Sequence, residues 1–127
     1  MPATEFVVLV VDDEPGFRRA VASALTRAGY HVLVASDGMD ARKQARTYDG
    51  IIHLLLTDVG LPDMDGLELA ATISKERPGI AVMAMSGQSL PIIPPELLKA
   101  LFQKPFRLSD LVNRVRHEME KGSSPFT

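Results

Sequence analysis

Five short runs of mainly apolar residues recur along this 127-residue chain, and they constrain its fold more than any other feature. Each run is four to seven residues long, which is too short for a typical helix, and polar residues do not alternate within it. Such runs are typical of strands that are buried on both faces of a parallel sheet. The predicted strands are Phe6 to Val11, His31 to Ala35, Ile51 to Thr57, Ile80 to Met85 and Ala100 to Gln103.

Between the runs, apolar residues recur at the spacing of helices that pack by one face. The predicted helices run from Pro15 to Gly29, from a cap at Ser36 or Asp37 to about Tyr48, from Leu67 to Arg77 and from Leu108 to Met119. The segment before the last strand differs, because Pro91, Pro94 and Pro95 leave only residues 95–99 for helical turns. We therefore expect a short or irregular fourth helix, with residues 88–99 carrying the output specificity.

Strands that alternate with helices predict an α/β fold with a parallel sheet, right-handed crossovers and helices on both faces. Five such units make a flavodoxin-like (βα)5 domain, a three-layer sandwich. We expect this domain to cover residues 1–121, followed by a flexible tail over residues 122–127 and no output domain.

The composition excludes several classes of protein. A net charge of −2 provides no basic field for nucleic acid or for an anionic membrane. The chain has no cysteine, no apolar run long enough to span a membrane and no signal-peptide pattern at its start. We expect a cytoplasmic protein that binds neither nucleic acid nor membrane.

Ligands of open α/β sheets bind outside the carboxyl ends of the strands, so the first polar residues after each run are informative. These residues are Asp12, Asp13, Asp58, Ser86 and Lys104. Converging carboxylates repel one another unless a cation lies between them, and hard oxygen ligands favour Mg²⁺, with Mn²⁺ as a substitute. A lysine, a hydroxyl group and Mg²⁺ together suit a phosphoryl group, with Asp58 as the nucleophile.

Each of these residues also has a purely structural interpretation. Acidic residues before a helix, as in Asp12-Asp13-Glu14, favour its N-terminus, while Asp58 suits a turn, Ser86 suits a cap and Lys104 suits the solvated surface. Their common position at the ends of four strands favours a shared site, because independent caps have no reason to be so complementary. For His53, inside an apolar run, we expect a packed or edge histidine rather than a ligand.

At these residues the chain resembles the receiver domain of bacterial two-component response regulators, from Glu5 to about Glu120. The matching motifs are Asp12-Asp13, the segment from Asp58 to Gly66 (DVGLPDMDG), Ser86 and Lys104-Pro105. Within the family, residues 53–70 look most like receivers attached to hybrid histidine kinases. The resemblance implies the strand order 2-1-3-4-5.

The resemblance also implies a function. Asp58 would take a phosphoryl group from a phosphohistidine on a sensor histidine kinase or phosphotransfer protein and switch the surface around strands 4 and 5. Asp13, Asp58 and the carbonyl group of Gly60 would bind Mg²⁺ directly, and Asp12 would reach it through water. Lys104 would neutralise one phosphoryl oxygen, and Ser86 would donate to another. The downstream protein stays unknown, and a homodimer stays open.

Two departures and two alternatives accompany this resemblance. The family usually has an aromatic residue where this chain has Leu101. In the family the fourth helix is also regular, whereas prolines interrupt it in this chain. Both departures favour one alternative, a receiver-like interaction module that is never phosphorylated, but the complete set of site residues argues against it. The other alternative is a haloacid-type phosphatase, which needs a second Asp where this chain has Gly60.

Overall fold

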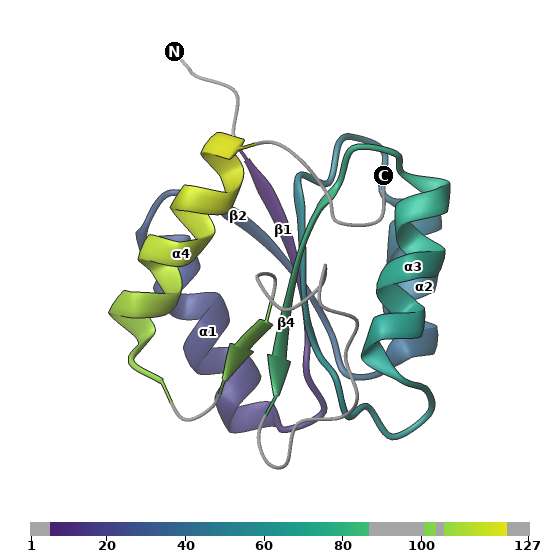
Figure 1. Cartoon of the computed structure of the whole chain (residues 1–127), viewed down its shortest axis with the longest axis horizontal. Helices are drawn as coiled ribbons and strands as arrows, with labels where there is room; N and C mark the ends of the chain where they lie inside the picture. The colour runs from purple at the N-terminus through teal and green to yellow at the C-terminus, as the bar shows by residue number, and fades with distance from the viewer. Residues whose placement is uncertain (1–5, 87–100, 104–105, 122–127) are drawn as a thin grey trace.

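A computed structural model describes residues 6–86, 101–103 and 106–121 as one parallel sheet covered by helices on both faces (Figure 1). The strands are β1 (Val7–Val11), β2 (His31–Ala35), β3 (Leu54–Asp58), β4 (Ala81–Ser86) and β5 (Leu101–Gln103), and the helices are α1 (Pro15–Arg27), α2 (Gly38–Thr47), α3 (Gly66–Glu76) and α4 (Leu108–Lys121). The strand order β2-β1-β3-β4-β5 and the flavodoxin-like class confirm the prediction. The expected irregular fourth helix over residues 88–99 lies outside the described residues, as does Lys104.

The third strand begins three residues later than predicted. In the ladder between β1 and β3, Val8 pairs with Leu54. Since β1 begins at Val7, only one residue of β1 precedes this pair, and most of the predicted strand before Leu54 has no partner in β1. Ile51 is 68% exposed, which a central strand would not allow. The apolar run alone overstated the strand, because Ile51 lies beyond the end of the sheet.

Two apolar clusters fill the space between the sheet and its helices. One joins β1, β3 and β4 to α2 and α3, through residues such as Leu9, Leu55 and Leu69. The other joins the opposite face of the same strands to α1 and α4, through residues such as Val10, Leu25 and Leu111. Figure 1 shows these helix pairs on opposite sides of the sheet. The described strands are therefore packed against helices on both faces of the sheet.

The N-termini of three helices are capped by side chains of the residues that precede them. The Glu14 carboxylate accepts hydrogen bonds from the backbone N–H groups of Gly16 and Phe17 at the start of α1. Asp37 accepts from Asp40 N–H at the start of α2, and Asp65 accepts from Leu67 N–H at the start of α3. Asp37, rather than Ser36, is thus the cap of α2.

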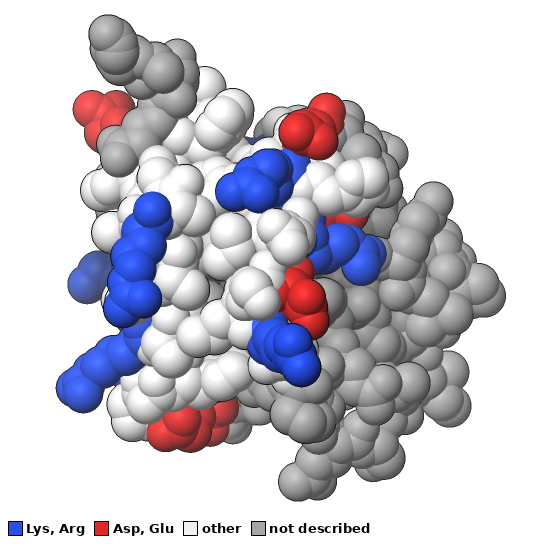
Figure 2. Space-filling view, turned by 90° about the vertical axis from the view of Figure 1, so that its left-hand side faces the viewer, with Lys and Arg blue, Asp and Glu red and all other residues white. Residues whose placement is uncertain are grey.

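Charged side chains are mixed on the side of the molecule that carries α1 and α4. Figure 2 shows Lys and Arg side chains spread over this face, with Asp and Glu side chains at several places among them. The described part of this face thus presents no continuous basic surface, in agreement with the net charge of −2. None of the described helices is long and apolar enough to cross a membrane.

Candidate functional site

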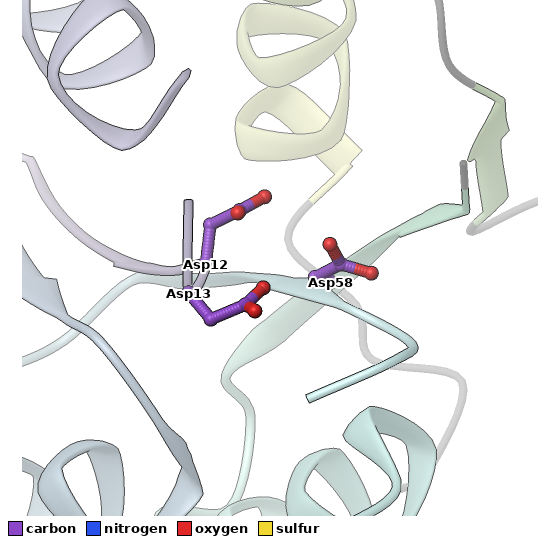
Figure 3. Close-up of side chains that lie close together, drawn as sticks. All are labelled: Asp12, Asp13 and Asp58. Atoms are coloured by element: carbon purple, nitrogen blue, oxygen red, sulfur yellow. The ribbon is translucent and has the colours of Figure 1, made fainter. Parts of the chain in front are cut away.

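Three carboxylates meet at the carboxyl edge of the sheet. Asp12 and Asp13 follow directly after β1, and Asp58 is the last residue of the adjacent strand β3. One carboxylate oxygen from each residue lies within 4.8 Å of the other two. Figure 3 shows the three side chains gathered in the space between the ends of these two strands. The neighbouring positions of β1 and β3 in a parallel sheet therefore create this cluster from residues far apart in sequence.

The cluster fits a hard divalent cation. Oxygen ligands around Mg²⁺ at about 2.0 to 2.1 Å lie roughly 2.9 to 4.2 Å apart, so a small contraction of the three side chains would complete such a geometry. Asp12 is only 1% exposed, whereas Asp13 is exposed and Asp58 is half-buried. The site is thus open on one side, which suits Mg²⁺ because this ion retains several of its waters.

Local hydrogen bonds orient the Asp58 side chain. The backbone N–H of Gly60 donates to Asp58 Oδ1 at 2.9 Å, and Thr57 Oγ1 donates to the Asp58 carbonyl oxygen at 3.0 Å. The loop after Asp58 closes on itself, because Gly66 N–H donates to the Val59 carbonyl at 2.8 Å. Gly60 therefore lies next to the acidic cluster.

Asp12 is held by the start of α1. Its Oδ1 accepts a hydrogen bond from Glu14 N–H at 2.9 Å, and its carbonyl oxygen accepts one from Arg18 Nη1 at 2.8 Å. Glu14 itself caps α1 and is not part of the cluster. The structural interpretation of the acidic segment is thus right for Glu14, while Asp12 and Asp13 turn toward Asp58.

Ser86 lies at the end of β4, beside the strand that ends in Asp58. The ladder pairs Asp58 with Met85, and Ser86 is buried, with 4% of its surface exposed. A buried hydroxyl group at this edge agrees with the position expected from the sequence.

The contacts of two loop residues could not be predicted from the sequence. Asp63 accepts hydrogen bonds from the N–H groups of Gly38 and Met39, which lower the pKa of its carboxyl group below the ordinary value. Gly66 packs directly on the Asp58 backbone, where any larger residue would collide. An Asp and a Gly in a turn are commonplace, so only the packing reveals these contacts.

Comparison with known proteins identifies the family. The family model for the response regulator receiver domain matches residues 8–116. The chain belongs to this family. Receivers generally bind Mg²⁺ at an acidic cluster, and the three carboxylates of this receiver form such a cluster. Receiver domains interact with histidine kinases or phosphotransfer proteins, so the family also supplies a class of partner.

The chain covers very different shares of its individual relatives. The receiver is similar to the response regulator receiver protein CpdR of Brucella abortus, with 35% identity over 85% of this chain and 92% of CpdR. It is also similar to the sensor kinase CckA of the same organism, with 30% identity over 90% of this chain but only 12% of CckA. A CheY-like receiver structure from Methanospirillum hungatei, at 24% identity, superimposes with a TM-score of 0.81 over 94% of this chain and 97% of its own. That last similarity concerns the fold alone.

Proposed function

We propose that this receiver accepts a phosphoryl group on Asp58 from a phosphohistidine, borne by a sensor histidine kinase or a phosphotransfer protein, in a Mg²⁺-dependent reaction. The observation that carries the proposal is the convergence of Asp12 and Asp13 on Asp58 at one strand edge. The family of phosphorylatable receivers supplies the context.

The orientation of the Asp58 carboxylate supports its role as nucleophile. Gly60 N–H donates to Oδ1, which helps to orient the carboxylate, and we propose Oδ2 as the attacking atom. A bond forms between Oδ2 and phosphorus as the bond between phosphorus and the donor imidazole nitrogen breaks, and the imidazole takes up a proton. The product is an acyl phosphate at residue 58.

Asp13, Asp58 and the carbonyl group of Gly60 would hold Mg²⁺ directly, with Asp12 acting through water. The bound ion neutralises charge on the phosphoryl oxygens. The buried Asp12 carboxylate, held by Glu14 N–H, fits this less direct role because its orientation is fixed from the side of α1.

Ser86 and Lys104 would complete the site. Ser86 follows Met85, whose carbonyl accepts from Val59 N–H, so the strand ends around the nucleophile are already linked. Donation from Ser86 to a phosphoryl oxygen, and neutralisation of another by Lys104, would draw the loop after β4 inward and change the surface around β4 and β5. A downstream protein in the cytoplasm would read this change. We propose that the receiver covers residues 1–121; the flexible tail expected over residues 122–127 lies outside the described residues.

Intact-protein mass spectrometry tests the proposal. Acetyl phosphate with Mg²⁺ should add one phosphoryl group to the wild type and none to Asp58→Asn, and chelation of Mg²⁺ should abolish the addition. Equal labelling of both proteins would reject Asp58 as the acceptor. No labelling of the wild type by acetyl phosphate or by phosphorylated kinase would favour the interaction module that is never phosphorylated.

A further inference from the structure

The loop that follows the nucleophile is hydrogen-bonded to the start of α2, which packs with α3 on the same face of the sheet. The two carboxylate oxygens of Asp63 each accept one backbone hydrogen bond, Oδ1 from Gly38 N–H and Oδ2 from Met39 N–H, both at 2.9 Å. These N–H groups belong to the first turn of α2, where they have no partner within the helix. Asp63 therefore joins the β3–α3 loop to the start of α2.

Packing beside this link is equally close. Gly38 is buried, and a Cβ atom at this position would meet Met64 Cγ at 2.5 Å, with Met64 Sδ closer still. Met64 packs in turn against the apolar cluster between the sheet and α2 and α3. Met64, the residue after Asp63, thus fills the space that a side chain at position 38 would need.

The base of the same loop is closed beside the acidic cluster. An antiparallel bridge joins Gly60 to Asp65, and Gly66 N–H donates to the Val59 carbonyl. Gly60 in turn donates to Asp58 Oδ1. Only two residues separate Gly60 from Asp63, so the Asp63 link to α2 and the hydrogen bond from Gly60 to Asp58 lie in one short closed loop.

We propose that Asp63 is a positioning residue for the magnesium and phosphoryl site, which couples the order of the first turn of α2 to occupancy of that site. This inference rests on the function proposed above and adds a second region that responds to it. Since coupling between two sites is reciprocal, binding at the acidic cluster protects the Gly38 and Met39 amides, and loss of the Asp63 link weakens ion binding.

The chain contains a matched control for this proposal. Asp37 caps the same end of α2 by accepting from Asp40 N–H, but among the described residues its carboxylate makes no hydrogen bond or ion pair with the β3–α3 loop. Asp63→Ala and Asp37→Ala each remove a carboxylate that caps α2, and only the former releases the loop. Asp63→Asn keeps one acceptor oxygen and places an amide donor opposite an N–H group, so it should behave between wild type and Asp63→Ala.

The experiment measures the Mg²⁺ dissociation constant by calorimetry and the hydrogen exchange of the metal-free proteins. We expect Asp63→Ala to weaken Mg²⁺ binding about tenfold, the lower end of the effect of removing support from a metal site, and Asp37→Ala to change it less than about twofold. Without metal, the Gly60 amide should exchange faster in Asp63→Ala than in Asp37→Ala. Circular dichroism checks that each variant is folded, and Asp63→Asn replaces Asp63→Ala if the latter is not.

Equal effects of the two alanine variants on Mg²⁺ affinity would overturn the proposal, as would wild-type affinity in Asp63→Ala. If the wild type itself binds no Mg²⁺, the proposed function fails, and the metal-free exchange at Gly60 still decides whether Asp63 positions the loop. Identical exchange at Gly60 in both alanine variants would reject that role.

Discussion

Replacing Gly66 by alanine should destabilise the receiver, although alanine is the better helix former. Gly66 is the first residue of α3, and a Cβ atom there would lie 2.9 Å from both the Asp58 carbonyl carbon and the Val59 Cα, and closer still to the Asp58 carbonyl oxygen. Carbon atoms in contact are normally about 3.5 to 4.0 Å apart, so the backbone must separate by at least about 0.6 Å. Because both colliding groups are backbone, no rotamer change relieves the overlap.

The two opposing contributions set the expected magnitude. Overpacking costs about 1 to 3 kcal/mol, and we take the upper end because backbone must move. Helix propensity returns at most about 1 kcal/mol, so Gly66→Ala should lose about 2 kcal/mol of unfolding free energy. For a domain of this size that loss lowers Tm by about 8 °C.

Urea unfolding followed by far-ultraviolet circular dichroism measures this free energy, with Gly60→Ala as the control from the same loop. Among the described residues, a Cβ at residue 60 would meet only Asp58 Oδ1, at 4.0 Å, so that variant should stay within about 0.5 kcal/mol of wild type. A Gly66→Ala protein as stable as wild type, or more stable, would refute the packing argument.

Three further predictions concern the helix ends, pH and the metal. Arg77 donates to three carbonyl oxygens at the end of α2 and in the loop after it, at 2.7 to 2.8 Å, so Arg77→Ala should cost about 3 kcal/mol in urea unfolding. Arg77→Lys should recover less than half of that loss, because an ammonium group cannot donate in the same fork, and full recovery would contradict this account. Burial lowers the pKa of His53, whose Nδ1 accepts from Val7 N–H at 3.0 Å, so the folded state disfavours the imidazolium. The stability that His53 contributes is complete above its pKa in the unfolded state and is lost as pH falls through its pKa in the folded state. The fall in unfolding free energy from about pH 7.5 to about pH 5.5 should therefore be smaller in His53→Gln than in wild type. An equal fall in both proteins would count against this role of His53. Mg²⁺ at about 100 times its dissociation constant should add about 2.7 kcal/mol to the unfolding free energy of wild type, and no rise in Tm would argue against the site.

Most of the fold could be predicted because β1, β3 and β4 are short apolar runs buried on both faces, a pattern typical of central strands in a parallel sheet. The convergence of Asp12 and Asp58 followed from this class, since carboxyl ends of neighbouring parallel strands share one edge. The strand order came from the family resemblance, because no local pattern states which strands are neighbours.

Other features depend on contacts between distant residues that local patterns do not contain. Asp63 and Gly38 are 25 residues apart, and an Asp in a turn has many simpler explanations. Arg77 contacts carbonyl groups 27 to 32 residues earlier, at a helix end where an exposed arginine would be equally common. Ile51 shows the opposite error, since an apolar residue beside a strand need not belong to it.

The position of the phosphoryl group is the most direct test of the central claim. An acyl phosphate is an activated carboxyl group, which borohydride reduces to the alcohol, so a phosphorylated aspartate becomes homoserine. After reaction with acetyl phosphate and Mg²⁺, reduction and proteolysis, tandem mass spectrometry should find homoserine at position 58 and unchanged aspartate at positions 12 and 13. Homoserine at position 12 or 13, or at no position in protein that carries a phosphoryl group, would contradict the assignment of Asp58 as the acceptor.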